Sequence, residues 1–323
     1  MPKVTVIIPL HRRSPAFERS VEEAVAVAAG KHEVLVVSDR DPGPLPDGAT
    51  SVVTDADGDT SPAEKRDLAL EQATGEICAF VDDDAYPRGD WIERALGRFA
   101  ADSGAAAVGG PGLTPPGSGW RERASGAFYE SRLGSGALRF RFVPLGGVRD
   151  VDDLPAYNFF VRTDALRSVG GWGSRFYGGE DTKVCLHLVE AGRRIVYDPD
   201  VVVYHHRRPI LGPHLRQVGN VGRHRGYFAR TLPATSRKPV YFAPTAAVAL
   251  AAVSIPVLAR SRRGRAFAAS CTAGAWTAIA GEALREGHDV AVAGVLPLVI
   301  GASHAVYGLQ FARGLVTPTI DAM

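Results

Sequence analysis

Short runs of apolar residues alternate with longer helical segments between residues 3 and 110, and this alternation constrains the fold more than any other feature of the sequence. The expected strands are 4–8, 34–37, 77–81 and 105–108. The expected helices are 15–29, 62–73 and 91–101. Strands that are apolar at every position, each followed by a helix, are typical of a parallel sheet covered on both faces. In such a sheet, ligands bind at the carboxyl ends of the strands.

The next segment, 111–155, is rich in Gly, Pro and Arg, and its apolar residues follow neither the helical nor the strand period. We predict an irregular insertion there that faces a substrate. Regular structure resumes with strands at 157–162, 195–197 and 201–204 and helices at 163–169 and 181–191.

The charged residues exclude one class of partner. The chain has 37 Lys and Arg against 35 Asp and Glu, and residues 1–239 hold 31 of each sign. Proteins that bind nucleic acid neutralise phosphates with an excess of basic side chains, so no nucleic-acid partner is expected. The cysteines, Cys78, Cys185 and Cys271, lie far apart in the sequence, which argues against a disulfide framework or a thiolate zinc site.

Basic residues without acidic ones mark the segment 205–238. Arg216, Arg223 and Arg230 are seven residues apart, and apolar residues recur three or four apart between Leu211 and Val221. This spacing predicts an amphipathic basic helix that lies on an anionic membrane surface. A solvated charged helix face is the alternative interpretation.

Three uncharged runs follow, at 240–259, 266–281 and 290–312. A membrane span needs about 20 apolar residues, so these runs predict C-terminal transmembrane helices, with a buried soluble helical subdomain as the alternative. Arginines are concentrated in the loop 260–265, and basic loops favour the cytoplasmic side. We therefore expect two crossings rather than three: 266–284 and 290–312 cross as a pair, and 240–259, with its two prolines, is re-entrant or interfacial.

Three consecutive carboxylates, Asp82, Asp83 and Asp84, follow the strand 77–81. Their mutual repulsion is relieved if a cation lies among them, and hard oxygen ligands suit Mg²⁺ or Mn²⁺. An acidic turn before the next helix is the alternative. Asp39 follows the second strand, where it could hydrogen-bond a base or a ribose.

A third polar group stands at the start of the helix 181–191. Gly178 and Gly179 precede Glu180 and Asp181, and the positive end of the helix dipole keeps a carboxylate ionised there. Such a carboxylate could take a proton from an alcohol. Helix capping alone is the alternative explanation.

Six motifs together resemble an inverting glycosyltransferase of family 2 with the GT-A fold. They are VTVIIPLHRR at 4–13, VLVVSDRD at 34–41, AEKRDLAL at 63–70, GEICAFVDDDAYP at 75–87, YNFFVRTDALRSVGGW at 157–172 and GGEDTKVCLHLVEAGRRIVYDPDVVVYHH at 178–206. Each motif is ordinary alone, but together they span most of residues 3–206 in the order of the family. The resemblance implies an α/β fold of the GT-A (Rossmann-like) kind, with a mixed, mainly parallel sheet and helices on both faces. The expected divisions are a catalytic domain at 1–206, a basic interfacial segment at 207–239 and a membrane region at 240–323.

The resemblance also implies roles for individual residues. The nucleotide sugar is expected to contact Pro9, Asp39, Lys65, Arg66, Asp82 and Asp83. The metal is expected to bind Asp82, Asp84 and His205. The remaining assignments are Trp172 and Asn158 for the sugar or the acceptor, and Asp181 as catalytic base with Glu180 beside it. Two departures from the family pattern are His11-Arg12-Arg13 after the first strand and Ser38-Asp39-Arg40 after the second. The Q-x-x-R-W motif of processive members is absent from the sequence, since Gln217 is followed by Val218, Gly219 and Asn220.

The implied reaction transfers one sugar, with inversion, from a nucleotide-diphosphate donor, for which we expect a UDP-sugar. The expected acceptor is a hydroxyl of a cell-envelope glycan or of a lipid-linked acceptor, and the expected location is the cell membrane, with anionic lipids as partners and the catalytic domain on the cytoplasmic side. The ratio of 32 Arg to 5 Lys favours a GC-rich bacterial source. Two alternatives stay open: a polyprenyl-phosphate sugar synthase, whose ionised acceptor needs no base, and a catalytically silent, nucleotide-binding membrane scaffold.

Overall fold

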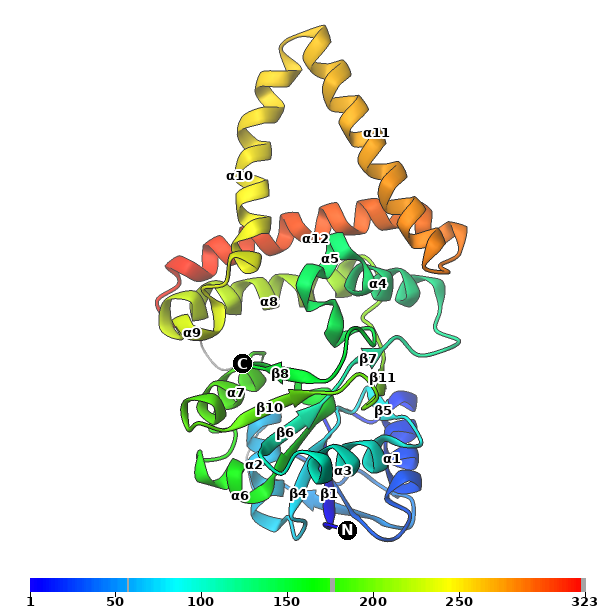
Figure 1. The fold of residues 1–323 in the computed structure, drawn as a ribbon, viewed down its shortest axis with the longest axis vertical. Helices are drawn as coiled ribbons and strands as arrows, with labels where there is room; N and C mark the ends of the chain where they lie inside the picture. The colour runs from blue at the N-terminus through cyan, green and yellow to red at the C-terminus, as the bar shows by residue number, and fades with distance from the viewer. Residues whose placement is uncertain (57, 175–177, 321–323) are drawn as a thin grey trace. The chain divides into compact units, whose positions relative to one another are not determined.

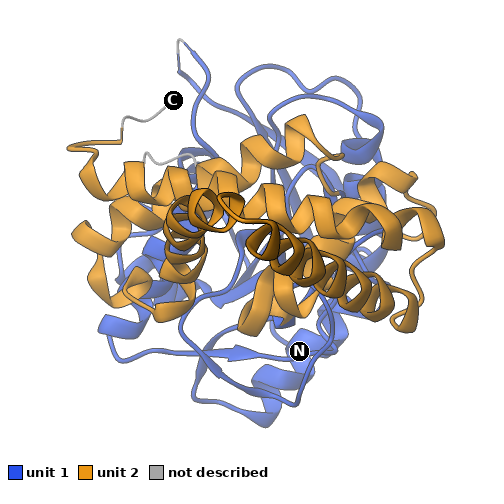
Figure 2. Ribbon diagram, turned by 90° about the horizontal axis from the view of Figure 1, so that it is seen from above, with its two compact units in different colours: residues 1–115, 140–206, 321–323 blue, residues 116–139, 207–320 orange. Residues whose placement is uncertain are grey.

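The computed structural model describes residues 1–56, 58–174 and 178–320 (Figure 1). The chain divides into two compact units, which Figure 2 shows in different colours. The described residues of unit 1 lie within 1–115 and 140–206, and unit 2 consists of 116–139 and 207–320. The segment 116–139 thus belongs to the same unit as the C-terminal helices.

An eight-stranded sheet forms the centre of unit 1, in the order β3-β2-β1-β4-β9-β6-β10-β8. Its strands are β1 (Val4–Pro9), β2 (Glu33–Ser38), β3 (Ala49–Val53), β4 (Ile77–Phe80), β6 (Ala105–Gly109), β8 (Arg149–Val151), β9 (Phe159–Arg162) and β10 (Arg194–Tyr197). Only the pairings of β9 with its two neighbours and of β8 with β10 are antiparallel in this sheet, as far as the described residues show. The expected mixed, mainly parallel sheet is confirmed. A smaller sheet has the order β5 (Ala85–Pro87), β11 (Val203–His205) and β7 (Gly112–Leu113).

Helices cover both faces of the large sheet because alternate residues of its buried strands belong to two different cores. In β1, Val6 and Ile8 pack in the core that includes Phe17 and Trp91, whereas Ile7 packs in the core on the opposite face. The helices of this unit are α1 (Pro15–Ala28), α2 (Pro62–Gln72), α3 (Trp91–Ala101), α6 (Thr163–Ser168) and α7 (Glu180–Glu190). Burial on both faces explains why these strands are apolar at every position in the sequence.

The prediction of irregular structure was wrong for part of 111–155. Helices α4 (Trp120–Glu130) and α5 (Arg132–Ser135) form there, and they belong to unit 2. The buried residues of α4 are mostly small, Ala124, Ser125, Gly126 and Ala127 beside Phe128. A face of small residues produces little hydrophobic periodicity, so the sequence pattern did not reveal the helix.

The remaining helices of unit 2 are α8 (Gly212–Thr231), α9 (Pro233–Ser236), α10 (Pro239–Ala259), α11 (Arg262–Arg285) and α12 (Val290–Val316). Two of them, α10 and α12, are long and apolar enough to cross a membrane, judged by length and composition; the most apolar stretch of α10 is 0% buried and that of α12 is 33% buried. Helix α10 is continuous although Pro244 and Pro256 lie inside it. The two prolines therefore do not break the helix at 240–259.

Helices α8 and α12 pack against each other through small residues. His214 of α8 lies between Ser125 Oγ and Ser303 Oγ, at 2.8 Å from each, and its ring is fully buried. Further along, Gly222 faces the Tyr307 backbone and Gly226 faces the Phe311 backbone so closely that a Cβ at either position would collide with a carbonyl oxygen. Of the apolar residues in the predicted spacing, Val218 is buried in this packing, whereas Val221 and Leu211, which precedes α8, are 49% and 46% exposed.

Replacing Gly226 with alanine should separate α8 from α12, because the new Cβ would overlap the Phe311 carbonyl. Overpacking of this kind costs about 1–3 kcal/mol, and we expect a lower midpoint in thermal unfolding of the detergent-solubilised protein. The control is Gly301→Ala on α12, where a Cβ meets no atom within 4 Å among the described residues. Equal stability of the two variants would contradict the close packing.

Candidate active site

The polar residues singled out in the sequence meet at one edge of the large sheet because they follow parallel strands. β1 pairs in parallel with both β2 and β4, and Pro9 at the end of β1 lies opposite Val37 of β2. Asp39 follows β2, and the carboxylate triplet follows β4 after Val81. This edge is where an open α/β sheet binds its ligands.

Asp82, Asp84 and His205 form a cluster that could hold a metal ion. One ligand atom of each lies within 4.8 Å of the others. His205 comes from a distant part of the sequence, and the antiparallel pairing of β11 with β5 brings it there, opposite Ala85. Its Nε2 lies 3.0 Å from Asp84 Oδ1. Two carboxylates and one imidazole suit Mn²⁺ or Mg²⁺, so the residues present fit the expected metal.

A buried arginine connects this cluster to helix α7. The guanidinium of Arg66 donates to Asp82 Oδ1 at 2.6 Å and to Glu180 Oε1 at 3.2 Å, and the Arg66 side chain is 2% exposed. Its flat face lies 4.5 Å from the ring centroid of Trp172. Burial raises the pKa of Asp82 above its usual value although Arg66 opposes this rise. The arginine therefore compensates two carboxylates that would otherwise repel each other.

The start of α7 presents the candidate base. Gly178 and Gly179 have φ of +99° and +93°, a conformation that favours glycine and turns the chain into the helix. Glu180 Oε2 accepts a hydrogen bond from Gly178 N at 2.9 Å, which fixes this turn. Asp181 is partly exposed, and its Oδ1 accepts from Thr182 N at 2.7 Å. An ionised carboxylate is stable at this end of the helix.

Asp39 and Lys65 form a second buried ion pair, with 2.5 Å between Lys65 Nζ and Asp39 Oδ2. The other carboxylate oxygen accepts from both the hydroxyl and the backbone N–H of Thr60. Burial raises the pKa of Asp39, but the hydrogen bonds from Lys65 and Thr60 outweigh burial and hold the pKa below its usual value. Lys65 thus acts on Asp39 in this structure, where the sequence suggested a contact with the nucleotide.

Two expected sugar contacts are buried in the structure. Trp172 is 0% exposed and packs edge-on against Phe80, with 4.9 Å between ring centroids. Asn158 is 0% exposed, accepts from Trp91 Nε1 and donates to the carbonyls of Pro111 and Val201. Neither side chain presents a surface to a sugar here. Their contacts hold the core beneath the site.

Asp83 holds the loop after β1. Its Oδ2 accepts from His11 N at 2.9 Å, and burial raises its pKa to about 6. The middle carboxylate of the triplet therefore organises the unusual His11-Arg12-Arg13 segment. Arg13 in turn donates to the carbonyls of Pro42 and Pro44, beyond β2.

The sequence did not reveal the role of Asp67. The Asp67 carboxylate accepts hydrogen bonds from Trp172 N at 2.7 Å and from Gly173 N at 2.9 Å. Helix α2 thus holds the backbone at 172–173. The available signal was position: Asp67 directly follows Lys65 and Arg66, whose side chains reach two other parts of the same site.

A mainly parallel Rossmann-like sheet, with a cluster at its carboxyl edge that could hold a metal ion, is typical of GT-A glycosyltransferases. Residues 5–164 match the family described as Glycosyl transferase family 2, and this part of the chain belongs to that family. The pre-mycofactocin glycosyltransferase of Mycobacterium tuberculosis is 29% identical over 214 residues, which cover 64% of this chain and 43% of that protein. The chain thus spans less than half the length of that relative.

Two further proteins are similar to this chain over much of its length. Glycosyltransferase AglE of Haloferax volcanii is 25% identical over 69% of this chain and 73% of its own length. The mannosyltransferase PcManGT of Pyrobaculum calidifontis, whose structure contains GDP-Man and Mn²⁺, has a TM-score of 0.56 over 95% of this chain and 87% of that chain, at 22% identity. This structural likeness establishes the shared fold.

Replacing Arg66 with methionine should strongly destabilise the protein. Asp82 and Glu180 would then face each other without the cation between them, and breaking a buried ion pair in this way costs about 3–5 kcal/mol. The measurement is thermal unfolding without added metal. Arg94→Met is the control, since Arg94 pairs with Asp90 on the exposed side of α3. A loss at Arg66 no larger than at Arg94 would show that the buried pair is not a stabilising link.

Proposed function

We propose that this protein is a membrane-associated, metal-dependent, inverting glycosyltransferase. In this proposal it transfers one sugar from a nucleotide-diphosphate donor to a hydroxyl of a cell-envelope glycan or of a lipid-linked acceptor. The observation that carries the proposal is the cluster of Asp82, Asp84 and His205, connected through Arg66 to Glu180 of α7. The family match supports the transfer of a sugar.

The donor diphosphate binds at the carboxyl edge of the sheet. Asp82, Asp84 and His205 would hold Mg²⁺ or Mn²⁺, which would neutralise the charge of the leaving diphosphate. Asp39, held in place by Lys65 and Thr60, follows β2 at this edge, and we assign it to the base or the ribose. The structure of PcManGT contains GDP-Man and Mn²⁺, and the expected UDP-sugar is therefore one of several donors to test.

Asp181 takes the proton of the acceptor hydroxyl as the hydroxyl attacks the anomeric carbon. Its carboxylate is kept ionised by the amino end of α7, and Arg66 fixes the adjacent Glu180. A base on the side of the sugar opposite to the leaving diphosphate produces inversion in a single displacement. The apolar helices α10 and α12 support an attachment to the cell membrane, with the catalytic unit on the cytoplasmic side, where nucleotide sugars are made.

Donor binding should require a divalent metal and Asp84. We expect a UDP-, GDP- or dTDP-sugar with Mn²⁺ to raise the thermal midpoint of the wild-type protein, because a ligand at 100 times its Kd stabilises by about 2.7 kcal/mol. Asp84→Asn should abolish the part of this shift that depends on Mn²⁺. Glu93→Gln, which changes an exposed carboxylate on α3, is the control. Equal donor affinity with Mn²⁺ and with a chelator would refute the metal assignment.

The role of Asp181 distinguishes the two enzymatic alternatives. With a hydroxyl acceptor, Asp181→Asn should lower kcat by about 10²–10⁴-fold and leave donor binding unchanged, because general base catalysis contributes that much. Asp164→Asn is a matched control, since Asp164 also stands in the first turn of a helix and its Oδ1 accepts from the next backbone N–H at 2.7 Å.

Near-normal turnover of Asp181→Asn with the native acceptor would instead indicate an acceptor that is already ionised, such as a polyprenyl phosphate. Transfer or metal-dependent hydrolysis of any nucleotide sugar by the purified protein would eliminate the third possibility, a catalytically silent scaffold.

A further inference from the structure

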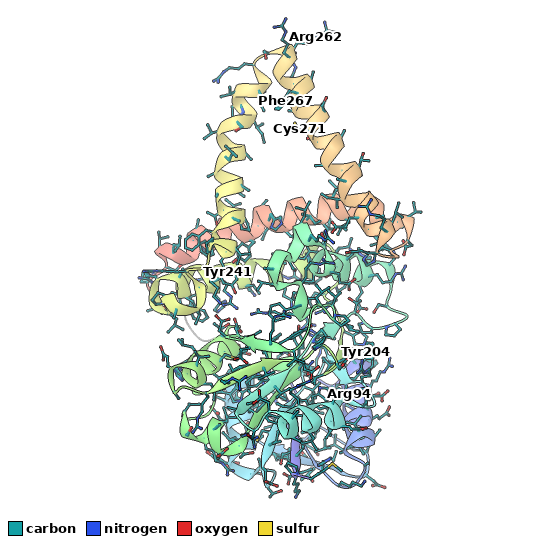
Figure 3. The ribbon with its side chains drawn as sticks, viewed as in Figure 1. Arg94, Tyr204, Tyr241, Arg262, Phe267 and Cys271 are labelled. Atoms are coloured by element: carbon teal, nitrogen blue, oxygen red, sulfur yellow. The ribbon has the colours of Figure 1, made fainter. Side chains whose placement is uncertain are left out.

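Helices α10 and α11 form a hairpin whose outer part is not covered by the rest of unit 2 (Figure 3). From 242 to 278, a stretch that the structure describes completely, no residue is buried. Large apolar side chains are among those exposed: Leu250 and Val253 are each 68% exposed, and Phe267 is 61% exposed. An apolar surface of this extent needs an apolar environment.

The charges of this hairpin are confined to its tip. Residues 242–259 and 266–278 contain no charged side chain, whereas the turn between the helices contains Arg260, Arg262, Arg263 and Arg265. Figure 3 shows Arg262 at the tip, with Phe267 and Cys271 following along α11. Two apolar helical segments joined by a turn of arginines would match a hydrocarbon layer bounded by anionic headgroups.

Helix α12 is apolar too, but it packs against α8, which carries arginines. It packs along α8 from the hydrogen bond between Ser303 and His214 to the close approach of Phe311 to Gly226. The 20-residue helix α8 carries four arginines, at 216, 223, 225 and 230. If α12 crossed the bilayer with this packing intact, α8 would enter the hydrocarbon with it, where arginine side chains are strongly disfavoured.

We infer that the α10–α11 hairpin is the part of the chain that crosses the bilayer and that α12 lies with α8 along the membrane surface. This inference rests on the membrane attachment in the proposed function and specifies which helices achieve it. It replaces the pairing of 266–284 with 290–312 that the charge pattern of the sequence suggested.

The dimensions agree with a crossing hairpin. Helix α10 has 21 residues, and at about 1.5 Å per residue it is about 31 Å long, close to the thickness of a hydrocarbon core of about 30 Å. The base of α10 meets α12, where Thr245 Oγ1 donates to the Gly308 carbonyl at 3.1 Å and Phe242 packs on Phe311. With α12 along one surface of the membrane, the arginines at the tip lie toward the headgroups of the opposite leaflet.

This topology places the arginine turn 260–265 on the side of the membrane opposite to α8 and α12, against the usual cytoplasmic bias of basic loops. The packing of α12 on α8 is a direct contact between backbones, and it decides against the alternative pairing. The two topologies differ in the side on which each loop emerges, so the location of the loops tests the inference.

The experiment labels single cysteines with a membrane-impermeant maleimide in intact cells that express the full chain. Cys271 is exposed and is first replaced by serine, whereas Cys78 and Cys185 are buried. In this background, Arg262→Cys reports the hairpin tip, and Val290→Cys reports the first, 78% exposed residue of α12. Labelling after denaturation in detergent is the control for each cysteine. Pelleting of the chain with washed membranes is measured separately.

We expect Arg262→Cys to be labelled in intact cells and Val290→Cys to be labelled only after permeabilisation. The reverse pattern would overturn the inference, since α11 and α12 would then cross as a pair. Labelling of both cysteines in intact cells, or of neither in a protein that pellets with membranes, would also overturn it. If the chain does not pellet with membranes, the membrane part of the proposed function fails, and a second copy of the chain becomes the partner that covers the hairpin.

Discussion

The catalytic unit depends on the burial of one guanidinium. Arg66 is 2% exposed, contacts Asp82 and Glu180, and lies over the ring of Trp172. Asp82 and Glu180, far apart in the sequence, could not both contact this point without a cation, because burial penalises each charge and their mutual repulsion adds to the penalty. A single side chain of α2 therefore connects the candidate metal cluster after β4 to the start of α7, where the candidate base lies.

Helix α2 organises the site through three successive residues. Lys65 reaches Asp39 after β2, Arg66 reaches the metal cluster, and Asp67 binds the backbone of the turn at Trp172. A capping box between Ser61 and Glu64 fixes where the helix begins and hence where these side chains point. Each of these three charged side chains thus contacts a group of opposite charge or a backbone donor in a different part of the site.

Close backbone packing has an equivalent influence in unit 2. Gly222 and Gly226 let α8 approach α12 so closely that the arginines of α8 accompany α12 wherever it lies. The hydropathy of α12 alone favours a membrane span. Its neighbour opposes this, and the location of an apolar helix is decided by the charges on the helix it packs against.

The sequence by itself determined the α/β architecture and the strand ends that carry Asp39 and the triplet, because burial on both faces leaves a continuous apolar pattern. It also determined the family of residues 5–164, because each motif is an unbroken stretch of sequence. Only the tertiary structure decided that Lys65 and Arg66 are buried partners of carboxylates, that Trp172 and Asn158 lie in the core, and that α4 is a helix. Ion pairs between residues on different elements, and helix faces made of small residues, leave no periodic signal in a sequence. Which apolar helices cross a membrane also leaves no such signal, because it depends on which helices pack together.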